Sequence, residues 1–266
     1  MANNPEAAGS HRYAAMTWQE LHDASQDARV VVIPVGSCEQ HGPALALETD
    51  TVRAVGLAAI LAERLSPRLL VAPALPVGVS EHHMGFPGTL TLSPSTFIQV
   101  LFEILESLRR HGWSKVFILN GHGGNDAALG VLSTRVMREL PGLALAWSGI
   151  SPLVTDISAK YAPSSLRGHS CEIETSQTMF LSPDSVRETR LEAGTSDRSQ
   201  LTGIAALSRS NKAIHLPLPY DRVTPSGALG DARSSSRELG ELLIETAADR
   251  LADFLEAFAN ETLVSE

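Results

Sequence analysis

The chain has 266 residues, of which 43% are hydrophobic and 19% are charged, and its formal net charge is −9. This composition supports a substantial buried core, fits one large α/β domain or two small ones, and excludes extensive disorder. The acidic excess and the absence of long Lys/Arg runs argue against nucleic acid as the main partner.

The N-terminal region and the cysteines bear on the expected location. Residues 1–12 are polar and lack the apolar core of a signal peptide, so we expect a flexible tail followed by one domain over 13–266. No run approaches 18 apolar residues, so no membrane span is predicted. Cys38 and Cys171 form no CxxC pair, which favours a reducing compartment. A cytoplasmic location is therefore expected.

Apolar spacing predicts alternating strands and helices. Thr17, followed by Glu20 three residues later, has the pattern of a capped helix start. In chain order, we expect a strand over 29–35, a helix over 50–65, strands over 69–75 and 88–92, a helix over 95–111, a strand over 115–119, a helix over 125–139, a strand over 143–147, and helices over 174–181 and 237–259.

This alternation predicts the fold class: an α/β fold with a mostly parallel sheet sandwiched by helices. In such sheets, functional sites form beyond the carboxyl ends of the strands. Glu39 and His41 follow the predicted strand over 29–35, and His122 follows the strand over 115–119. These side chains are therefore expected at one edge of the sheet.

Each candidate also has an ordinary structural interpretation. Glu39 and His41 alternate in an extended loop and so face the same way, but a solvated loop is the alternative. Asp50 precedes a predicted helix and could cap it. His122 lies among glycines that permit close backbone approach, although such a turn before a helix also suits a phosphate. The last candidate, Glu174, could be a surface residue.

Taken together, these residues are typical of a two-metal hydrolytic centre. They supply the three carboxylates and two imidazoles Glu39, His41, Asp50, His122 and Glu174. Carboxylates can bridge divalent ions, and imidazoles favour zinc, manganese or iron over calcium. We therefore expect two divalent metal ions, zinc first, with manganese or iron as alternatives. A cysteine hydrolase that uses Cys171 with His169 is a competing interpretation.

Five segments together resemble the creatininase family of metal-dependent amidohydrolases. The matching text is VGSCEQHGPALALETD (35–50), VSEHHMGFPGTLTL (79–92), ILNGHGGND (118–126), HSCEIETS (169–176) and, more weakly, PSGALGDARSSSRELGELLIE (225–245). The resemblance covers about residues 30 to 250. It implies a creatininase-like fold, commonly assembled as a homohexamer.

The resemblance also implies roles for individual residues. Glu39 and His122 would complete one metal site, His41 and Glu174 the other, and Asp50 would bridge both ions. His169 would be the catalytic residue that transfers a proton to the leaving nitrogen. Residues near the substrate would be His83, Gly123, Gly124 and Trp147, although Trp147 could equally be a core residue.

The resemblance implies hydrolysis of a C–N bond in a small molecule: a cyclic amide, a formamide or a related compound. Creatinine-processing members carry Tyr-Glu directly after the metal-binding His, whereas this chain has Gly123-Gly124. They also carry a Trp at the position where this chain has Ser165. Creatinine is therefore expected to be a poor substrate, and a non-peptide amide is favoured. The alternatives are a mycofactocin-type peptidase that releases a short peptide tail and a non-catalytic nucleotide or phosphate binder.

Overall fold

The computed structural model describes residues 11–211 and 213–262. Its centre is a four-stranded parallel sheet in the order β2-β1-β3-β4. The strands are β1 (Val30–Val35), β2 (Leu69–Val71), β3 (Lys115–Asn120) and β4 (Ala144–Gly149). Parallel strands need crossover helices, which cover both faces of the sheet.

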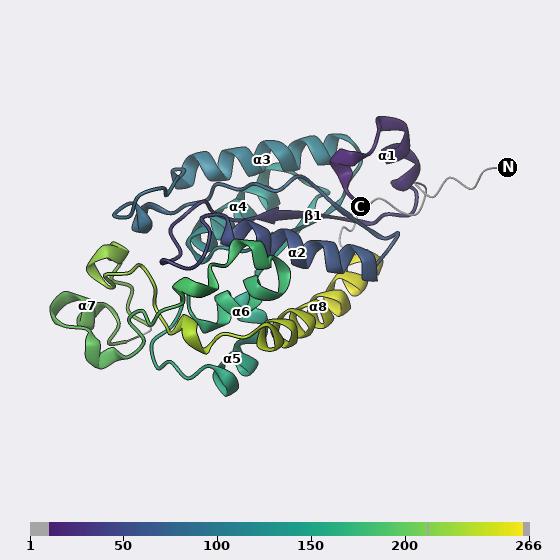
Figure 1. Ribbon diagram of the computed structural model, residues 1–266. Coiled ribbons are helices and arrows are strands. Elements are labelled where there is room, and N and C mark those ends of the chain that lie inside the picture. The colour runs from purple at the N-terminus through teal and green to yellow at the C-terminus, as the bar shows by residue number, and fades with distance from the viewer. Residues whose placement is uncertain (1–10, 212, 263–266) are drawn as a thin grey trace.

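The two faces of the sheet pack against different helices (Figure 1). Val30 and Val32 of β1 face a core formed with α2 (Thr49–Arg64), α6 (Glu172–Leu181) and α8 (Arg237–Asn260). Val31 and Ile33 face the opposite core, formed with α1 (Trp18–Ala24), α3 (Pro94–Arg110) and α4 (Asp126–Glu139). The predicted fold class is confirmed, because β1 is buried along its whole length.

Two short helices lie outside these layers. They are α5 (Thr155–Tyr161) and α7 (Gly203–Ser208). Helix α7 lies with its loops at the end of the molecule opposite α1 (Figure 1). Its neighbourhood has a small core of its own, which includes Leu201, Val223 and Leu229. Among residues 11–211 and 213–262, none of the helices has both the length and the apolar character needed to cross a bilayer.

Two strand predictions were wrong in detail. The strand expected over 69–75 ends at Val71, because Pro73 cannot donate a ladder hydrogen bond; the chain rejoins β1 only at Leu75. Residues 88–92 form no strand, since Leu90 makes a single bridge, to Cys38, and is 58% exposed. Of the predicted N-terminal tail, residues 1–10 lie outside the described residues, whereas Arg12 pairs with Val71.

One backbone contact fixes the end of β3 against the start of α2. A Cβ atom at Gly121 would lie 2.1 Å from the backbone oxygen of Asp50, closer than any side chain allows. Glycine is therefore required at this position. The contact sets the spacing between the residues that follow β3 and those that begin α2.

Candidate metal centre

The five predicted metal ligands meet at the carboxyl edge of the sheet. They come from the loop after β1, the first turn of α2, the turn after β3 and the first turn of α6: Glu39, His41, Asp50, His122 and Glu174. All are buried except the half-buried Glu174. Asp50 does not cap its helix, since α2 begins at Thr49 and Glu48 holds the N-cap position.

One half of the cluster is built around His122. Its Nδ1 lies 3.2 Å from Oε1 of Glu39 and 3.1 Å from Oδ2 of Asp50. The other oxygen of Glu39 accepts a hydrogen bond of 2.6 Å from the Ser80 hydroxyl. This bond orients the carboxylate so that Oε1 faces the imidazole. Nδ1 of His122 therefore lies within 3.2 Å of one oxygen from each of two carboxylates.

The other half of the cluster is built around His41. Its Nε2 lies 3.3 Å from Oδ1 of Asp50, so the two oxygens of Asp50 face two different imidazoles. Glu174 belongs to this half, because His41, His169 and Glu174 each offer a ligand atom within 4.8 Å of the others. The geometry thus matches a carboxylate that bridges two neighbouring sites.

Backbone carbonyls set the tautomers of the two candidate ligand imidazoles. Nδ1 of His41 lies 3.2 Å from the backbone oxygen of Glu39, and Nε2 of His122 lies 3.1 Å from that of Val79. A carbonyl oxygen can only accept, so each of these nitrogens carries its hydrogen. In the neutral rings, the lone pairs of His41 Nε2 and His122 Nδ1 then face the carboxylates, as metal ligation requires.

The cluster also contains polar atoms that no protein group satisfies. Glu39 Oε1, His41 Nε2 and Asp50 Oδ2 are buried and make no hydrogen bond within the described part of the chain. Buried polar atoms normally find partners, and an unsatisfied one costs about 1–3 kcal/mol. These three atoms belong to three different predicted ligands. The donor set therefore fits divalent cations.

A buried arginine that the sequence did not single out contacts two carboxylates of the half built around His41. Arg53 is 1% exposed, and its Nη1 lies 3.3 Å from Asp50 Oδ1 and 3.0 Å from Glu174 Oε1. Gln177 Oε1 accepts from Nε at 3.0 Å and from Nη2 at 2.7 Å. Arg53 follows Asp50 by one helical turn, and this spacing was the available sequence signal.

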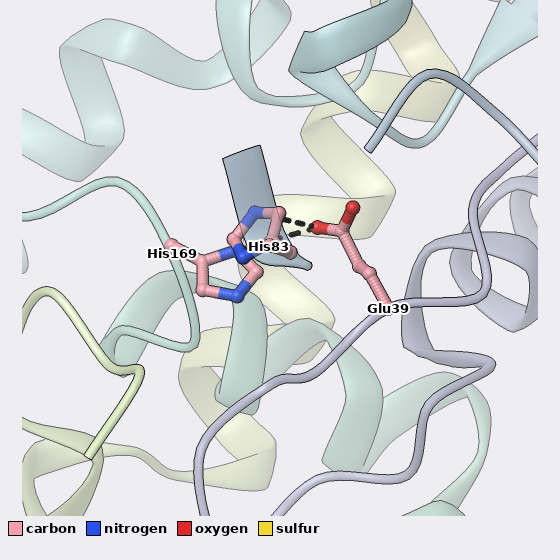
Figure 2. Close-up of side chains that lie close together, drawn as sticks. All are labelled: Glu39, His83 and His169. Atoms are coloured by element: carbon pink, nitrogen blue, oxygen red, sulfur yellow. Dashed lines mark ion pairs between the residues drawn. The ribbon is translucent and has the colours of Figure 1, made fainter. Parts of the chain in front are cut away.

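Two further imidazoles, His83 and His169, lie side by side next to the Glu39 carboxylate (Figure 2). Nε2 of His83 lies 3.2 Å from Glu39 Oε1, and Nδ1 of His169 lies 3.6 Å from the same oxygen. Nε2 of His169 donates to the backbone oxygen of Gln40 at 2.7 Å, so Nδ1 carries the lone pair. In contrast, Nδ1 of His83 accepts from the Gln40 amide at 2.8 Å, so its Nε2 carries the hydrogen and faces Glu39 without making a hydrogen bond.

The imidazoles differ in their affinity for protons. Burial opposes protonation of His41, but the adjacent Asp50 raises the pKa of His41 to about 9. Burial and His169 lower the pKa of His83 to about 2, and burial and His41 lower the pKa of His169 to about 4. His83 and His169 are therefore neutral at pH 7. Each can act as a hydrogen-bonding group, and His169 is the stronger base of the two.

Backbone strain occurs beside His169. Ser170 has a φ of 49°, a left-handed conformation that is uncommon outside glycine. Its backbone N–H donates to Glu174 Oε2 at 2.7 Å, and its hydroxyl donates to the backbone oxygen of His41 at 2.7 Å. The two bonds tie the strained residue to the half of the cluster that is built around His41.

His82 and Tyr220 complete the cluster on its open side, and sequence analysis assigned no role to either. The half-buried His82 stacks on His122 with ring centroids 5.6 Å apart, and it can join Glu39 and His122 around a metal ion. The Tyr220 ring lies 4.2 Å from the His83 ring and 5.1 Å from the His169 ring. Tyr220 lies in a segment without periodicity, so no sequence signal pointed to it.

Comparison with protein families matches residues 14–255 to the family described as Creatininase, creatinine amidohydrolase. The chain belongs to the creatininase family. It is 30% identical over 255 residues to a mycofactocin precursor peptide peptidase from Mycolicibacterium smegmatis, covering 91% of this chain and 92% of that protein. It is 29% identical over 267 residues to a creatinine amidohydrolase from Pseudomonas putida, covering 90% of this chain and 93% of that protein.

The fold agrees with this membership. The crystal structure of a putative creatinine amidohydrolase from Bacteroides fragilis superposes with a TM-score of 0.81 at 23% identity, covering 96% of this chain and 98% of that one. As a creatininase-family amidohydrolase, the chain carries its buried carboxylates and imidazoles at the strand ends, where a parallel α/β fold places its sites.

The predicted substrate-binding residues fall into different environments. Gly124 adjoins the cluster, since a Cβ there would lie 2.2 Å from His122 Nε2. A Cβ at Gly123 would meet no atom within 4 Å, so the position is open. Trp147 is partly buried and packs against the core that contains α3 and α4, as the core interpretation expects.

The cysteine chemistry considered as an alternative is not favoured. Cys171 is 3% exposed and packs in the core beneath α2, α6 and α8. Burial raises the pKa of its thiol to about 12. A thiol nucleophile needs a lowered pKa and access to substrate. Cys171 therefore behaves as a core residue.

Proposed function

We propose that the chain hydrolyses an amide C–N bond with two divalent metal ions, held by Glu39, His41, Asp50, His122 and Glu174. The observation that carries this proposal is the set of three buried, unsatisfied atoms on Glu39, His41 and Asp50. With His41 and His122 neutral, as ligation requires, three carboxylates and a single buried guanidinium leave an excess of negative charge, which divalent cations would balance. Zinc suits this donor set, with manganese or iron as alternatives.

The protein groups around the ions would position substrate and move one proton. A pair of divalent ions, when bound, acidifies water and polarises a carbonyl oxygen. Nδ1 of His169 carries a lone pair and faces Glu39 Oε1 at 3.6 Å. We assign to this atom the uptake of a proton from attacking water and its delivery to the departing nitrogen. The strained turn at Ser170 would keep the ring in place.

His83 and Tyr220 would have supporting roles. The Nε2 of His83 lies 3.2 Å from Glu39 Oε1 and would limit the movement of that carboxylate, as a second layer of contacts commonly does at metal sites. Burial raises the pKa of Tyr220 to about 12, so its hydroxyl remains a donor at neutral pH. The ring would also limit access of bulk water to His169.

The space around the cluster favours a substrate larger than creatinine. One cavity of about 470 Å³ reaches His82 and Tyr220, and a second of about 380 Å³ reaches Glu174. Cavities of roughly 300–1,000 Å³ hold drug-sized ligands. Gly123 adds open space beside His122. The end of a short peptide fits this space, in agreement with the similarity to mycofactocin precursor peptide peptidases.

A small non-peptide amide is the second candidate. The chain is nearly as similar to a creatinine amidohydrolase as to the peptidases, at 29% against 30% identity. Non-catalytic phosphate binding has less support. The turn after β3 faces the carboxylates Glu39 and Asp50 through His122, and these would repel a phosphate.

The proposal is tested by metal analysis combined with a substrate panel. Protein stripped with EDTA and reloaded with zinc or manganese should hydrolyse at least one of creatinine, N-formyl amino acids or short peptides, as followed by mass spectrometry. Activity should vanish on stripping and return on reloading. Full activity without stoichiometric metal would contradict the proposal.

The matched control removes a carboxylate far from the cluster. Asp156 pairs with Arg250 on the surface, so Asp156→Ala should retain its metal and activity while Asp50→Ala loses both. Equal metal content in the two variants would contradict the assignment of Asp50 as a metal ligand. A homohexamer and a cytoplasmic location remain part of the proposal; light scattering tests the first, and fractionation tests the second.

A further inference from the structure

A basic cavity adjoins the open side of the cluster. His82 and Tyr220 form the wall that it shares with the cluster, and its volume is about 470 Å³. Its remaining charged lining comes from three arginines in separate segments: Arg167, Arg198 and Arg209. The cavity therefore begins where the His82 and His83 rings contact Tyr220.

The charge of this cavity contrasts with that of the chain. The formal net charge is −9, yet no Asp or Glu is present among the described residues that line the cavity. Excess positive charge in a recess attracts anions and raises their local concentration. An anionic ligand group is therefore favoured here against the overall charge of the protein.

The three guanidinium groups retain donors for a ligand. Arg167 donates to the backbone oxygen of Ser164 at 2.9 Å, and Arg198 donates to the backbone oxygen of Arg209. The guanidinium carbon of Arg209 lies 5.9 Å from the centre of the Tyr220 ring. Across residues 11–211 and 213–262, none of the three makes an ion pair with a carboxylate of the chain. Each guanidinium has five N–H donors, so most are free to bind another group.

We propose that this cavity binds a carboxylate of the substrate, while the scissile amide lies at the cluster beyond Tyr220. The inference rests on the proposed amide hydrolysis and names its substrate class: an amide with a free carboxylate on one side of the bond. A guanidinium binds a carboxylate through two parallel N–H···O bonds, which gives both affinity and orientation. The carboxylate could belong to a small acylamino acid or to the C-terminus of a short peptide.

The test compares ligands that differ only in this charge. N-acetylglycine and N-acetylglycinamide form the small-molecule pair, and triglycine and triglycinamide form the peptide pair. Each is titrated calorimetrically into the metal-loaded protein. The acid of at least one pair should bind about 10-fold to 100-fold more tightly than its amide, the range for a hydrogen bond to a charged group. The pair with the larger preference identifies the source of the carboxylate.

Three variants separate the cavity from the metals as the binding site. Arg209→Gln and Arg198→Gln should each reduce the preference for the acid. The effect of Arg209→Gln should be the larger, because Arg209 is half-buried whereas Arg198 is exposed to solvent that screens its charge. Arg110→Gln, an equal charge loss at the exposed end of α3, should leave the preference intact. Equal binding of acid and amide in the wild type would overturn the inference, as would a preference that survives both cavity variants.

The outcome can be separated from that of the proposed function, because binding is measured without turnover. A protein that prefers the acid but hydrolyses no amide would contradict the proposed function and support the carboxylate site. A protein that hydrolyses amides and binds acid and amide equally would support the proposed function and contradict the carboxylate site.

Discussion

Replacing Arg53 with Met should destabilise the metal-free protein strongly. The guanidinium is buried, and it lies within 3.3 Å of Asp50 Oδ1 and 3.0 Å of Glu174 Oε1. Met matches much of the arginine stem but leaves both carboxylates without their cation and Gln177 Oε1 without its donor. Removing one partner of a buried ion pair costs about 3–5 kcal/mol. That is a large share of a typical total stability of roughly 5–15 kcal/mol.

Bound metal should reduce this loss. Divalent ions held by Asp50 and Glu174 would supply positive charge to the same two carboxylates, so the guanidinium should contribute less to the stability of the loaded protein. By linkage, metal then stabilises Arg53→Met more than it stabilises the wild type. The expected pattern is a loss of several kcal/mol after EDTA treatment and a smaller loss after reloading.

The assay is urea unfolding of the stripped and the reloaded proteins. Arg64→Met is the matched control, because Arg64 lies on the same helix and pairs at the surface with Glu245 and Asp249. Surface pairs contribute about 0–1 kcal/mol, so this variant should change little. An equal loss for Arg53→Met with and without metal would refute the electrostatic reasoning, and a loss as small as that of the control would refute the buried pairing itself.

The other predictions concern the ligands, the proton carrier, the substrate and the thiols. Asp50→Ala should lose more metal than any other single ligand variant, because its two oxygens face both halves of the cluster; elemental analysis checks this. His169→Ala should keep its metal and lose about 10²–10⁴-fold in turnover, whereas loss of metal would make it a ligand. Creatinine should be hydrolysed more slowly than the best amide of the panel in a direct rate comparison. At pH 8.5, iodoacetamide should label Cys38 and leave Cys171 unmodified until urea unfolds the protein. The pKa of about 12 for Cys171 leaves little of its thiol as thiolate. Mass spectrometry of the protein before and after unfolding checks the order of labelling.

The sequence predicted the layers of the fold well, because burial leaves a clear pattern. Continuous apolar runs mark β1 and β3, and helical spacing marks α2, α3, α4 and α8. The strand at 88–92 was wrong because β-like composition does not supply a neighbouring strand. The start of α6 was placed at 174, whereas the helix begins at Glu172; helix ends are set by local hydrogen bonds that periodicity does not record.

The site was predictable only where function depends on residue type. Carboxylates and imidazoles after strands pointed to a metal centre, and the structure brings the five together. Arg53 and Tyr220 were missed for different reasons. A lone arginine in an amphipathic helix is usually at the surface, and Tyr220 reaches the cluster through a long irregular segment. Neither contact follows from spacing, because both depend on how distant segments pack.

The cluster also has a consequence for how the protein is made. The side chains of the cluster come from N-terminal and C-terminal parts of the chain, and the contact between Arg53 and Glu174 spans 121 residues of sequence. Contacts of such long range form late in folding, after local helices and turns. A nascent chain that extends only through α4 carries Glu39, Asp50 and Arg53 but lacks Glu174. Such a chain would carry part of the ligand set without the geometry that holds two ions, so the reactive centre would mature only in a fully synthesised protein.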